Sequence, residues 1–567
     1  MSAPWLVTLG GAALRFHQLA REPFWFDEAY TALSVQLPVR GILERLRGEG
    51  NAPLYYLLMH AWSAVFGDGV YAFRLVSALL GTLTIPLLYW IGVRMFSRRA
   101  ALIAAILAAV APLHIHYSQE ARMYPLVPPF ALMALYALDR LLIVPAAWAV
   151  VGFAVAVLGG LYTQYYFLFF LPLAAAVLWA PQRRRSLVFT AGALLLVGLG
   201  FAPWIPSFID QASNSSPDWI GGFWRTRSLA IAVPWSLQSL GPGALYPGWA
   251  TFKFMSSSST GALSLAFAAL VIGGAVVQLV KSSPSGRRQG LHPWLMGAAP
   301  PGLLPQDPTD DKSGIEPRKG RHSRAGGEAP GEFGDSCEGS PQEDRQSLTQ
   351  RTTSLALTLG AVLVPLCLAC VVSLMRHPVY VVARYDLIAW GAYCLLSGAV
   401  LARFKPPVML AAVALWLGVA GVTLWPYLTT ERPKRNYADM GDRIAQALVQ
   451  RARPGESVVF TAATRTMTQY YLRADPQRFR LASYPLGTDA HLGWIDDRIQ
   501  NSPQLAAEAA QRFAAWLVDS GDPPVVIWIV APRSRGTAPL LAELQRRGYV
   551  EDGKRSLGAL LLCLRRT

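Results

Sequence analysis

The strongest constraint on this chain is a series of long apolar blocks of about 17–23 residues, the length at which an α-helix crosses a hydrocarbon core of about 30 Å. "VMLAAVALWLGVAGVTLW" is one of them, and they recur as far as about residue 430. Only 15% of the residues are charged, against about a quarter in soluble proteins. Helices that are apolar all round cannot share one soluble core. The sequence therefore predicts a polytopic α-helical membrane protein.

The apolar blocks predict about eleven transmembrane helices, in a membrane domain that we place at residues 1–430. They lie near 4–20, 71–93, 100–117, 124–138, 142–161, 165–180, 187–205, 260–280, 353–375, 386–402 and 408–427. Residues 281–352 are rich in Gly, Pro and Ser with mixed charge. Such a segment buries too little apolar surface to offset its ordering entropy, so we predict a disordered cytoplasmic insert.

Positive charge gathers in alternate loops of a chain whose formal net charge is +16. Examples are Arg98 with Arg99, and Arg403 with Lys405. The positive-inside tendency makes these loops cytoplasmic. The pattern fits membrane topology and anionic headgroups, and we expect no nucleic-acid partner. The five cysteines imply no disulfide framework, which favours the inner (plasma) membrane of a bacterium.

The composition turns soluble near residue 431, on the side opposite the basic loops. "ESVVFTA" and "PPVVIWIVAP" are typical of buried strands, and "TAPLLAELQRRGY" of a helix before a last strand, "GALLLCLRR". We therefore expect residues 431–567 to form an extracytoplasmic α/β domain with a partly parallel sheet.

The most informative polar segment is "REPFWFDEAYT", directly after the first predicted span. Asp27 and Glu28 are adjacent carboxylates among aromatic side chains at the predicted membrane surface. Charges so close to hydrocarbon are costly and mark either function or pairing. A carboxylate there could act as a general base. A solvated acidic pair between interfacial aromatic anchors fits the spacing equally well.

Two aromatic segments on the same predicted side are candidates for sugar binding. "GNAPLYYLLMHAW" supplies Asn51, Tyr55 and Tyr56, and "LYTQYYF" supplies Gln164. An interfacial tyrosine belt explains the first segment nearly as well, and a short turn between spans explains the second.

"HIHYSQEARMYPL" ends the third predicted span with Glu120, Arg122 and Tyr124. An arginine beside a carboxylate at a membrane boundary suits a lipid phosphate, with Arg122 on the phosphate and Glu120 on a hydroxyl or a metal ion. His114 and His116 could join Glu120 around a divalent ion. The spacing is loose, so we assign no metal site and leave metal dependence open.

"VYVVARYDLIAW" brings Arg384 and Tyr385 to the outer end of the tenth predicted span. Arg384 is the second candidate ligand for a phosphate, and an arginine reaching out to lipid headgroups is the alternative. Every candidate cluster thus falls on the side that the Lys and Arg counts independently make extracytoplasmic.

In this order, "FWFDEAYT", "NAPLYYLLMHAW", "YSQEARMYPL" and "ARYDLIA" resemble the GT-C superfamily of glycosyltransferases. The resemblance is to bacterial relatives of the dolichyl-phosphate-mannose protein mannosyltransferases and of the lipid A aminoarabinose transferase. It covers residues 1–430 and, more loosely, the outer domain. The insert at 281–352 is not a feature of the family, and Gln164 stands where a basic residue or His is usual.

The resemblance implies an inverting transfer of a sugar from a polyprenyl phosphate. Asp27 would be the catalytic carboxylate, with Glu28 as its companion and Glu120 in the second acidic motif. Arg122 and Arg384 would stabilise the departing lipid phosphate, which needs charge stabilisation more than protonation.

The leading hypothesis is therefore a membrane glycosyltransferase acting on an extracytoplasmic lipid, glycan or protein acceptor. A transporter or flippase of lipid-linked precursors is the alternative, but the sequence lacks the mid-membrane charges and repeated halves typical of transporters. A membrane scaffold is a third hypothesis, and it would depend on residues 432–567 rather than on Asp27.

Overall fold

The computed structural model describes most of the chain. The described residues are 2–180, 182–214, 220, 224, 228–243, 259–282, 341–375, 378–429, 441–461, 464–486, 499, 502–519, 521–532, 537–557 and 559–567. Most of the insert predicted at 281–352 lies outside them.

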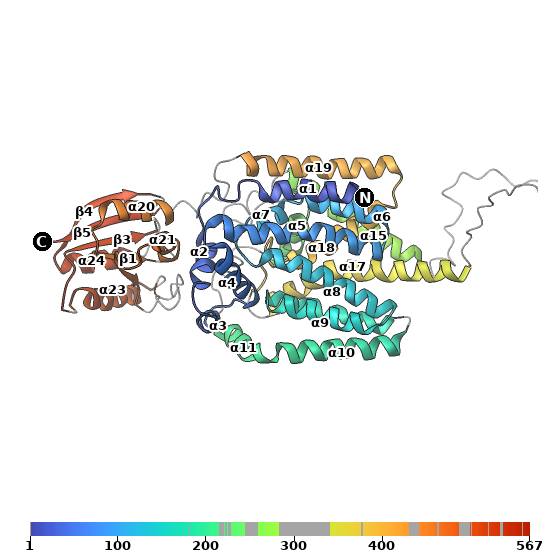
Figure 1. Ribbon diagram of the computed structural model, residues 1–567, viewed down its shortest axis with the longest axis horizontal. Helices are drawn as coiled ribbons and strands as arrows, with labels where there is room; N and C mark the ends of the chain where they lie inside the picture. Colours follow the sequence, from blue (N-terminus) through green and yellow to red (C-terminus); the bar gives the residue numbers. More distant parts are fainter. Residues whose placement is uncertain are drawn as a thin grey trace, which may run out of the picture.

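Residues before 430 form a bundle of roughly aligned helices (Figure 1). Its longer helices are α1 (Ser2–Phe16), α5 (Val70–Met95), α6 (Arg98–Ala109), α8 (Val127–Ile143), α9 (Ala147–Leu161), η2 (Tyr165–Trp179), α10 (Arg183–Phe201), α15 (Ser259–Ser282), α17 (Pro341–Met375), α18 (Leu387–Leu401) and α19 (Pro406–Thr429). The shorter ones are α2 (Phe26–Ser34), α3 (Val39–Arg47), α4 (Leu54–Phe66), α7 (Pro112–Ser118), η1 (Tyr124–Leu126), η3 (Ala202–Trp204), α11 (Ile205–Asn214), η4 (Leu229–Ile231) and α13 (Ala232–Leu240).

Several helices are able to cross a membrane. By length and composition 6 of the described helices qualify, or 7 if the pair α6–α7, bent by 60°, is one span. Five further apolar helices have 10–17 residues. The chain is thus a multi-pass membrane protein, while the expected number of about eleven spans is not confirmed. The helices at the spans expected at 4–20 and 142–161 are shorter than predicted, since α1 ends at Phe16 and α9 begins at Ala147.

Both ends of the insert predicted at 281–352 are helical in the structure. Helix α15 continues to Ser282, and α17 begins at Pro341 and so includes residues 341–352. Proline is well suited to the first position of a helix, and the polar run after Pro341 holds no further helix breaker before the apolar block. Residues 283–340 lie outside the described part of the chain.

Helix α18 lies at the centre of the bundle, and all 15 of its residues are buried. It packs against α6, α8, α15 and α17. Its closest approach to α6 depends on Gly398, because a Cβ there would overlap the carbonyl oxygen of Ala100 and lie 2.9 Å from the Cβ of Ala104. The turn that carries Arg384 leads directly into this helix.

The C-terminal sheet region (residues 441–567) holds a five-stranded sheet with strand order β2-β1-β3-β5-β4. The strands are β1 (Ser457–Thr461), β2 (Arg480–Tyr484), β3 (Val526–Ala531), β4 (Tyr549–Ser556) and β5 (Leu560–Arg566). β1 runs parallel to β2 and β3, and β5 runs antiparallel to β3 and β4. The sheet is therefore partly parallel, in agreement with the sequence analysis.

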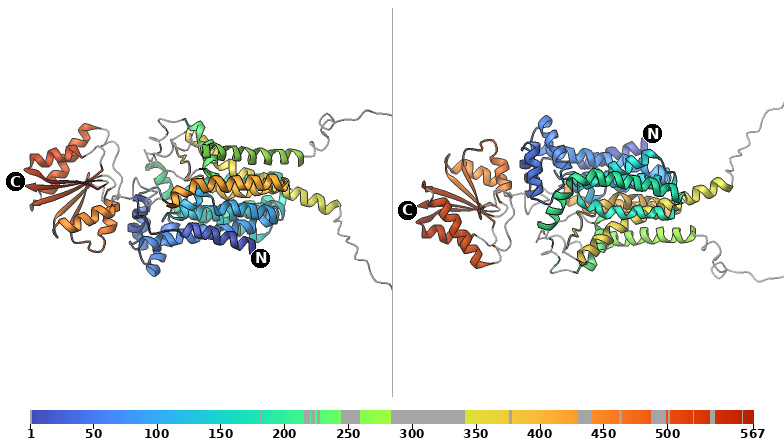
Figure 2. Two further views of the ribbon diagram at one scale, coloured as in Figure 1. Left: turned by 90° about the horizontal axis from the view of Figure 1, so that it is seen from above. Right: turned by 90° about the horizontal axis from the view of Figure 1, so that it is seen from below.

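Helices cover both faces of this sheet, as Figure 2 shows. They are α20 (Gly441–Arg451), α21 (Thr464–Leu472), α23 (Pro503–Val518) and α24 (Ala538–Arg546). Successive side chains of β1 point to opposite faces of the sheet. Val458 and Phe460 pack in the core under α20, and Val459 packs in the core under α23 and α24.

The sheet region lies at the end of the bundle where α2, α3, α4 and α11 are found, and the N-terminus lies at the opposite end (Figures 1 and 2). Helix α21 packs on α2. Met467 and Tyr470 of α21 belong to the core of the bundle rather than to either core of the sheet region. The two parts of the chain therefore share buried apolar surface.

We expect Gly398→Val to destabilise the bundle by about 1–3 kcal/mol, the usual cost of overpacking a core. The added side chain has no space between α18 and α6, so the thermal midpoint of the purified protein in detergent should fall. Gly192→Val on α10 is the matched control, because nothing lies within 4 Å of a Cβ at that position. Equal midpoints for the two variants would contradict the close packing of α18 and α6.

Candidate active site

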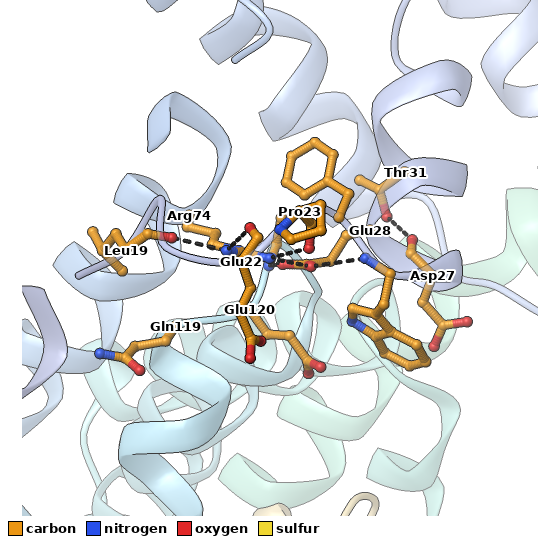
Figure 3. Close-up of polar contacts among 12 residues, drawn as sticks. Leu19, Glu22, Pro23, Asp27, Glu28, Thr31, Arg74, Gln119 and Glu120 are labelled. Carbon is orange, nitrogen blue, oxygen red and sulfur yellow. Dashed lines mark hydrogen bonds and ion pairs between the residues drawn. The ribbon is translucent and has the colours of Figure 1, made fainter. Parts of the chain in front are cut away.

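The two carboxylates of the acidic pair stand in the first turn of α2, where acidic side chains interact favourably with the helix dipole. Adjacent residues of an α-helix point about 100° apart. Asp27 and Glu28 therefore diverge, and Figure 3 shows Glu28 directed at Arg74 and Asp27 directed away from it. The pair is divided between two different environments.

Glu28 is fully buried in an ion pair with Arg74. Arg74 Nη2 lies 2.6 Å from Glu28 Oε2, and Arg74 Nε lies 2.8 Å from Glu28 Oε1. The same guanidinium donates to the carbonyl oxygens of Leu19, Glu22 and Pro23 at 2.8, 2.9 and 3.2 Å (Figure 3). Arg74 thus fastens the loop before α2 to the beginning of α5.

Glu28 also accepts two backbone hydrogen bonds. The amide of Ala121 donates to Oε1 at 2.8 Å, and the amide of Trp25 donates to Oε2 at 3.5 Å. Its carboxylate therefore joins α2 to the loop that holds Glu120 and Arg122. These contacts are those of a side chain that fixes backbone segments in place.

Asp27 lies between two guanidinium groups from distant parts of the chain. Its Oδ2 is 3.8 Å from Nε of Arg122 and 3.6 Å from Nη2 of Arg384. Nη1 of Arg122 further donates to the hydroxyls of Tyr56 and Thr31, at 3.1 and 3.3 Å. The structure thus brings together Asp27, Arg122 and Arg384, which the sequence analysis placed on one side of the membrane.

Arg384 is held by aromatic rings and by an unusual turn. Its guanidinium carbon lies 5.7 Å from the ring centroid of Trp25 and 5.5 Å from that of Tyr124, within the range of cation–π attraction. The preceding Ala383 has φ +57°, a conformation that L-residues rarely adopt. Asp386 Oδ2 accepts the Ala383 amide at 2.9 Å and so supports the turn that presents Arg384.

Burial and neighbouring charges set the protonation of two of these groups. Burial lowers the pKa of Arg122, but Tyr56 and Asp27 outweigh it and hold that pKa well above its ordinary value. Burial raises the pKa of Tyr56 above its ordinary value, against the opposing effect of Arg122. At neutral pH the site therefore holds a charged guanidinium and a protonated phenol.

Two buried polar side chains have atoms without a hydrogen-bond partner within the described part of the chain. They are Trp25, at Nε1, and Gln164, at both amide atoms. Buried polar groups are almost always satisfied in folded proteins. These donors and acceptors would suit a polar ligand.

Three other predicted residues, Tyr124, Tyr385 and Asn51, make contacts with aromatic side chains. Tyr124 packs on Tyr117 with ring centroids 4.6 Å apart, and Tyr385 packs on Tyr166 at 4.8 Å. The backbone carbonyl of Asn51 accepts from Tyr165 Oη at 3.5 Å. The catalytic and binding roles expected for these side chains stay predictions.

The two histidines considered as metal ligands are divided, because His116 lies beside Glu120 and His114 is bound to Arg15. His114 Nδ1 lies 2.9 Å from Arg15 Nη2, and its ring stacks on Trp390. His116 Nε2 lies 3.9 Å from Glu120 Oε1. Among the residues that the structure describes, no three His, Cys, Asp or Glu side chains are arranged to hold a metal ion.

Arg74 was missed by the sequence analysis. The available signal was a charged residue four positions into the apolar block predicted at 71–93, where an ionised side chain is costly unless it is paired. Thr31, one helical turn after Asp27, was missed as well, and nothing in its local sequence singles it out.

Comparisons with known proteins agree with the resemblance found in the sequence. The model of the dolichyl-phosphate-mannose-protein mannosyltransferase family matches residues 50–209. No curated protein matches the chain. Among solved structures, the oligosaccharyltransferase of Archaeoglobus fulgidus in its apo form matches with a TM-score of 0.50 at 12% identity, over 97% of this chain and 72% of that one. This likeness shows a shared fold.

Two further structures match more loosely. ArnT from Cupriavidus metallidurans bound to undecaprenyl phosphate is 14% identical over 99% of this chain and 98% of that one, with a TM-score of 0.44. The Pmt1-Pmt2 protein O-mannosyltransferase complex of S. cerevisiae bound to its sugar donor is 18% identical over 36% and 34%, with a TM-score of 0.30.

We expect Arg74→Met to lower the free energy of unfolding by about 3–5 kcal/mol, because it leaves the Glu28 carboxylate buried without its counter-ion. Combining it with Glu28→Gln should recover part of the loss, since no uncompensated charge then remains. Thermal midpoints of the purified proteins test this. Arg40→Ala, at the exposed Arg40–Glu44 pair, is the control and should leave the midpoint unchanged. A double variant no more stable than Arg74→Met would contradict the pairing.

Proposed function

We propose that this chain, a GT-C glycosyltransferase related to the protein mannosyltransferases and the aminoarabinose transferase, transfers a sugar from a polyprenyl-phosphate donor to an acceptor at the extracytoplasmic face of a membrane. The donor would lie with its phosphate at Arg122 and Arg384. The acceptor would be a lipid, a glycan or a protein. The flippase alternative finds no support in the comparisons.

The observation that carries this proposal is the placement of Asp27 between Arg122 and Arg384. At 3.8 and 3.6 Å these pairs are longer than the 2.7–2.9 Å of a tight, charge-assisted hydrogen bond. The Asp27 carboxylate is partly exposed, at 19% of its side-chain surface. Such a loose cluster of two cations and one anion has a net positive charge that suits a phosphate, and it keeps a carboxylate oxygen available beside it.

The chemistry then follows from these positions. An acceptor hydroxyl attacks the anomeric carbon of the sugar and gives its proton to Asp27. A new carbon–oxygen bond forms as the bond between the anomeric carbon and the phosphate oxygen breaks on the opposite side, so the configuration inverts. The lipid phosphate leaves as an anion that Arg122 and Arg384 stabilise, so no strong general acid is needed.

The polar atoms without partners support sugar binding. Trp25 Nε1 and the Gln164 amide offer donors and an acceptor to sugar hydroxyls. We propose Asn51, Tyr55, Tyr56 and Tyr124 as further substrate-binding residues, and Tyr385 as a further residue at the donor phosphate. Glu28 acts in this proposal as the companion that keeps α2 in position, and Glu120 belongs to the loop that it holds.

The arrangement of the chain supports the proposed membrane orientation. Helices α2, α3 and α4 and the C-terminal sheet region lie at one end of the bundle, and the N-terminus lies at the other (Figure 1). The arginine-rich starts of α6 and α10 belong to the end that the positive-inside tendency makes cytoplasmic. The sheet region would then be an extracytoplasmic domain of residues 431–567, on a membrane domain of residues 1–430 in a bacterial inner membrane.

We expect Asp27→Asn to lower the transfer rate by about 100-fold or more, because an amide cannot accept the proton of the acceptor. The assay uses the full chain in nanodiscs with a panel of labelled undecaprenyl-phosphate hexoses and pentoses, and with membrane lipids and envelope glycans as acceptors. The variant should keep the thermal midpoint of the wild type. Binding of undecaprenyl phosphate should also persist, since both arginines remain.

Asp210→Asn, at an exposed aspartate of α11, is the matched control and should transfer at the wild-type rate. Full transfer by Asp27→Asn would refute the catalytic assignment. Passage of the labelled lipid across a sealed liposome without formation of a glycosidic bond would refute the proposed activity and favour the flippase.

A further inference from the structure

Helix α21 of the C-terminal sheet region presents one face to the membrane bundle. Met467, Tyr470 and Tyr471 stand at positions i, i+3 and i+4, which share one side of a helix. Met467 and Tyr470 are buried in the core of the bundle, whereas Leu472 belongs to a core of the sheet region. This helix therefore connects the two cores.

Tyr471 fixes the chain just before α2. The amide of Phe24 donates to the hydroxyl of Tyr471 at 2.6 Å. Phe24 stands three residues before Asp27, and the next amide, that of Trp25, donates to Glu28. The two amides that lead into α2 are thus bound by one group from the bundle and one from the sheet region.

Tyr470 adds an aromatic contact to the same segment. Its ring lies 4.8 Å from that of Phe24, which also lies 5.8 Å from the ring of Phe73. Phe24 is therefore enclosed between α21 and the first turn of α5. An enclosed ring at this point restricts how far the start of α2 can move.

A second attachment lies at the start of α5. Tyr470 Oη donates to the carbonyl oxygen of Asp68 at 2.7 Å, and Arg473 Nε donates to the Asp68 carboxylate at 2.7 Å. The hydrogen bond from Arg473 holds the pKa of Asp68 below its ordinary value. Asp68 lies two residues before α5, which carries Arg74, so α21 contacts both segments joined by the Glu28–Arg74 pair.

We infer that Tyr471 is a positioning residue for Asp27, through which the sheet region acts on the chemical step of the transfer. The inference rests on the proposed function. It assigns to the sheet region a contribution to rate that is separate from any recognition of the acceptor. A small displacement of a reacting group costs a large factor in rate, and the hydroxyl of Tyr471 opposes such a displacement of α2.

The test compares two tyrosine hydroxyls of the sheet region, each bound to backbone. Tyr471→Phe removes the contact with Phe24 and keeps the ring. Tyr549→Phe is the matched control, because its hydroxyl donates to the carbonyl of Pro524 at 2.5 Å and it lies on β4, away from the bundle. We expect Tyr471→Phe to lower kcat about tenfold with KM for donor and acceptor unchanged, and Tyr549→Phe to leave both unchanged.

Hydrogen–deuterium exchange gives a readout that needs no activity. Amides in the peptide covering residues 19–34 should exchange about fivefold faster in Tyr471→Phe than in the wild type or Tyr549→Phe, as expected for the loss of one hydrogen bond. Unfolding midpoints of the two variants should agree, which excludes a general loss of stability as the cause.

The possible failures are distinguishable. If wild-type chain transfers sugar and Asp27→Asn does not, an unchanged kcat in Tyr471→Phe overturns the positioning role alone. A raised KM with unchanged kcat overturns it too, in favour of substrate recognition by the sheet region. Absence of transfer by the wild type refutes the proposed function. The exchange experiment remains valid in that case, and unchanged exchange of residues 19–34 in Tyr471→Phe would refute the claim that Tyr471 fixes the start of α2.

Discussion

The site depends on one buried guanidinium, that of Arg74. Arg74 binds the Glu28 carboxylate and three backbone carbonyls of the loop before α2. A charge in such surroundings is tolerated only when nearly all of its hydrogen-bonding groups are matched. That requirement fixes the loop against α5. Since Glu28 is committed to Arg74, its neighbour Asp27, about 100° around the helix, is directed away from Arg74 and toward Arg122 and Arg384.

The grouping of Asp27 with Arg122 and Arg384 could be anticipated because each residue falls at the same end of the bundle under the positive-inside tendency. The different environments of Asp27 and Glu28 could not be predicted, because adjacency in sequence does not show which of the two side chains faces the interior. The strand β4 also escaped notice, since seven of its eight residues are exposed and show no apolar alternation. The role of α21 could not be predicted either, because it depends on a contact between Phe24 and Tyr471, which are more than 400 residues apart in the chain.

The number of spans was harder to predict for a physical reason. Hydropathy reports whether a segment is apolar, and it does not distinguish a helix that faces lipid from one that is enclosed by other helices. Helix α10 exposes much of its surface, whereas every residue of α18 is buried, yet both are apolar over most of their length. The bend of 60° between α6 and α7 similarly divides what the sequence presents as one continuous block.

The enclosure of α18 has a consequence for how the protein is made. Its 15 residues extend for only about 22 Å at 1.5 Å per residue, which is less than the hydrocarbon thickness of about 30 Å. Lipid alone would therefore accommodate this segment poorly. Along the chain α18 follows all the described membrane helices except α19, so most of the helices that enclose it are made before it. Arg384 reaches its place only when α18 has entered among them.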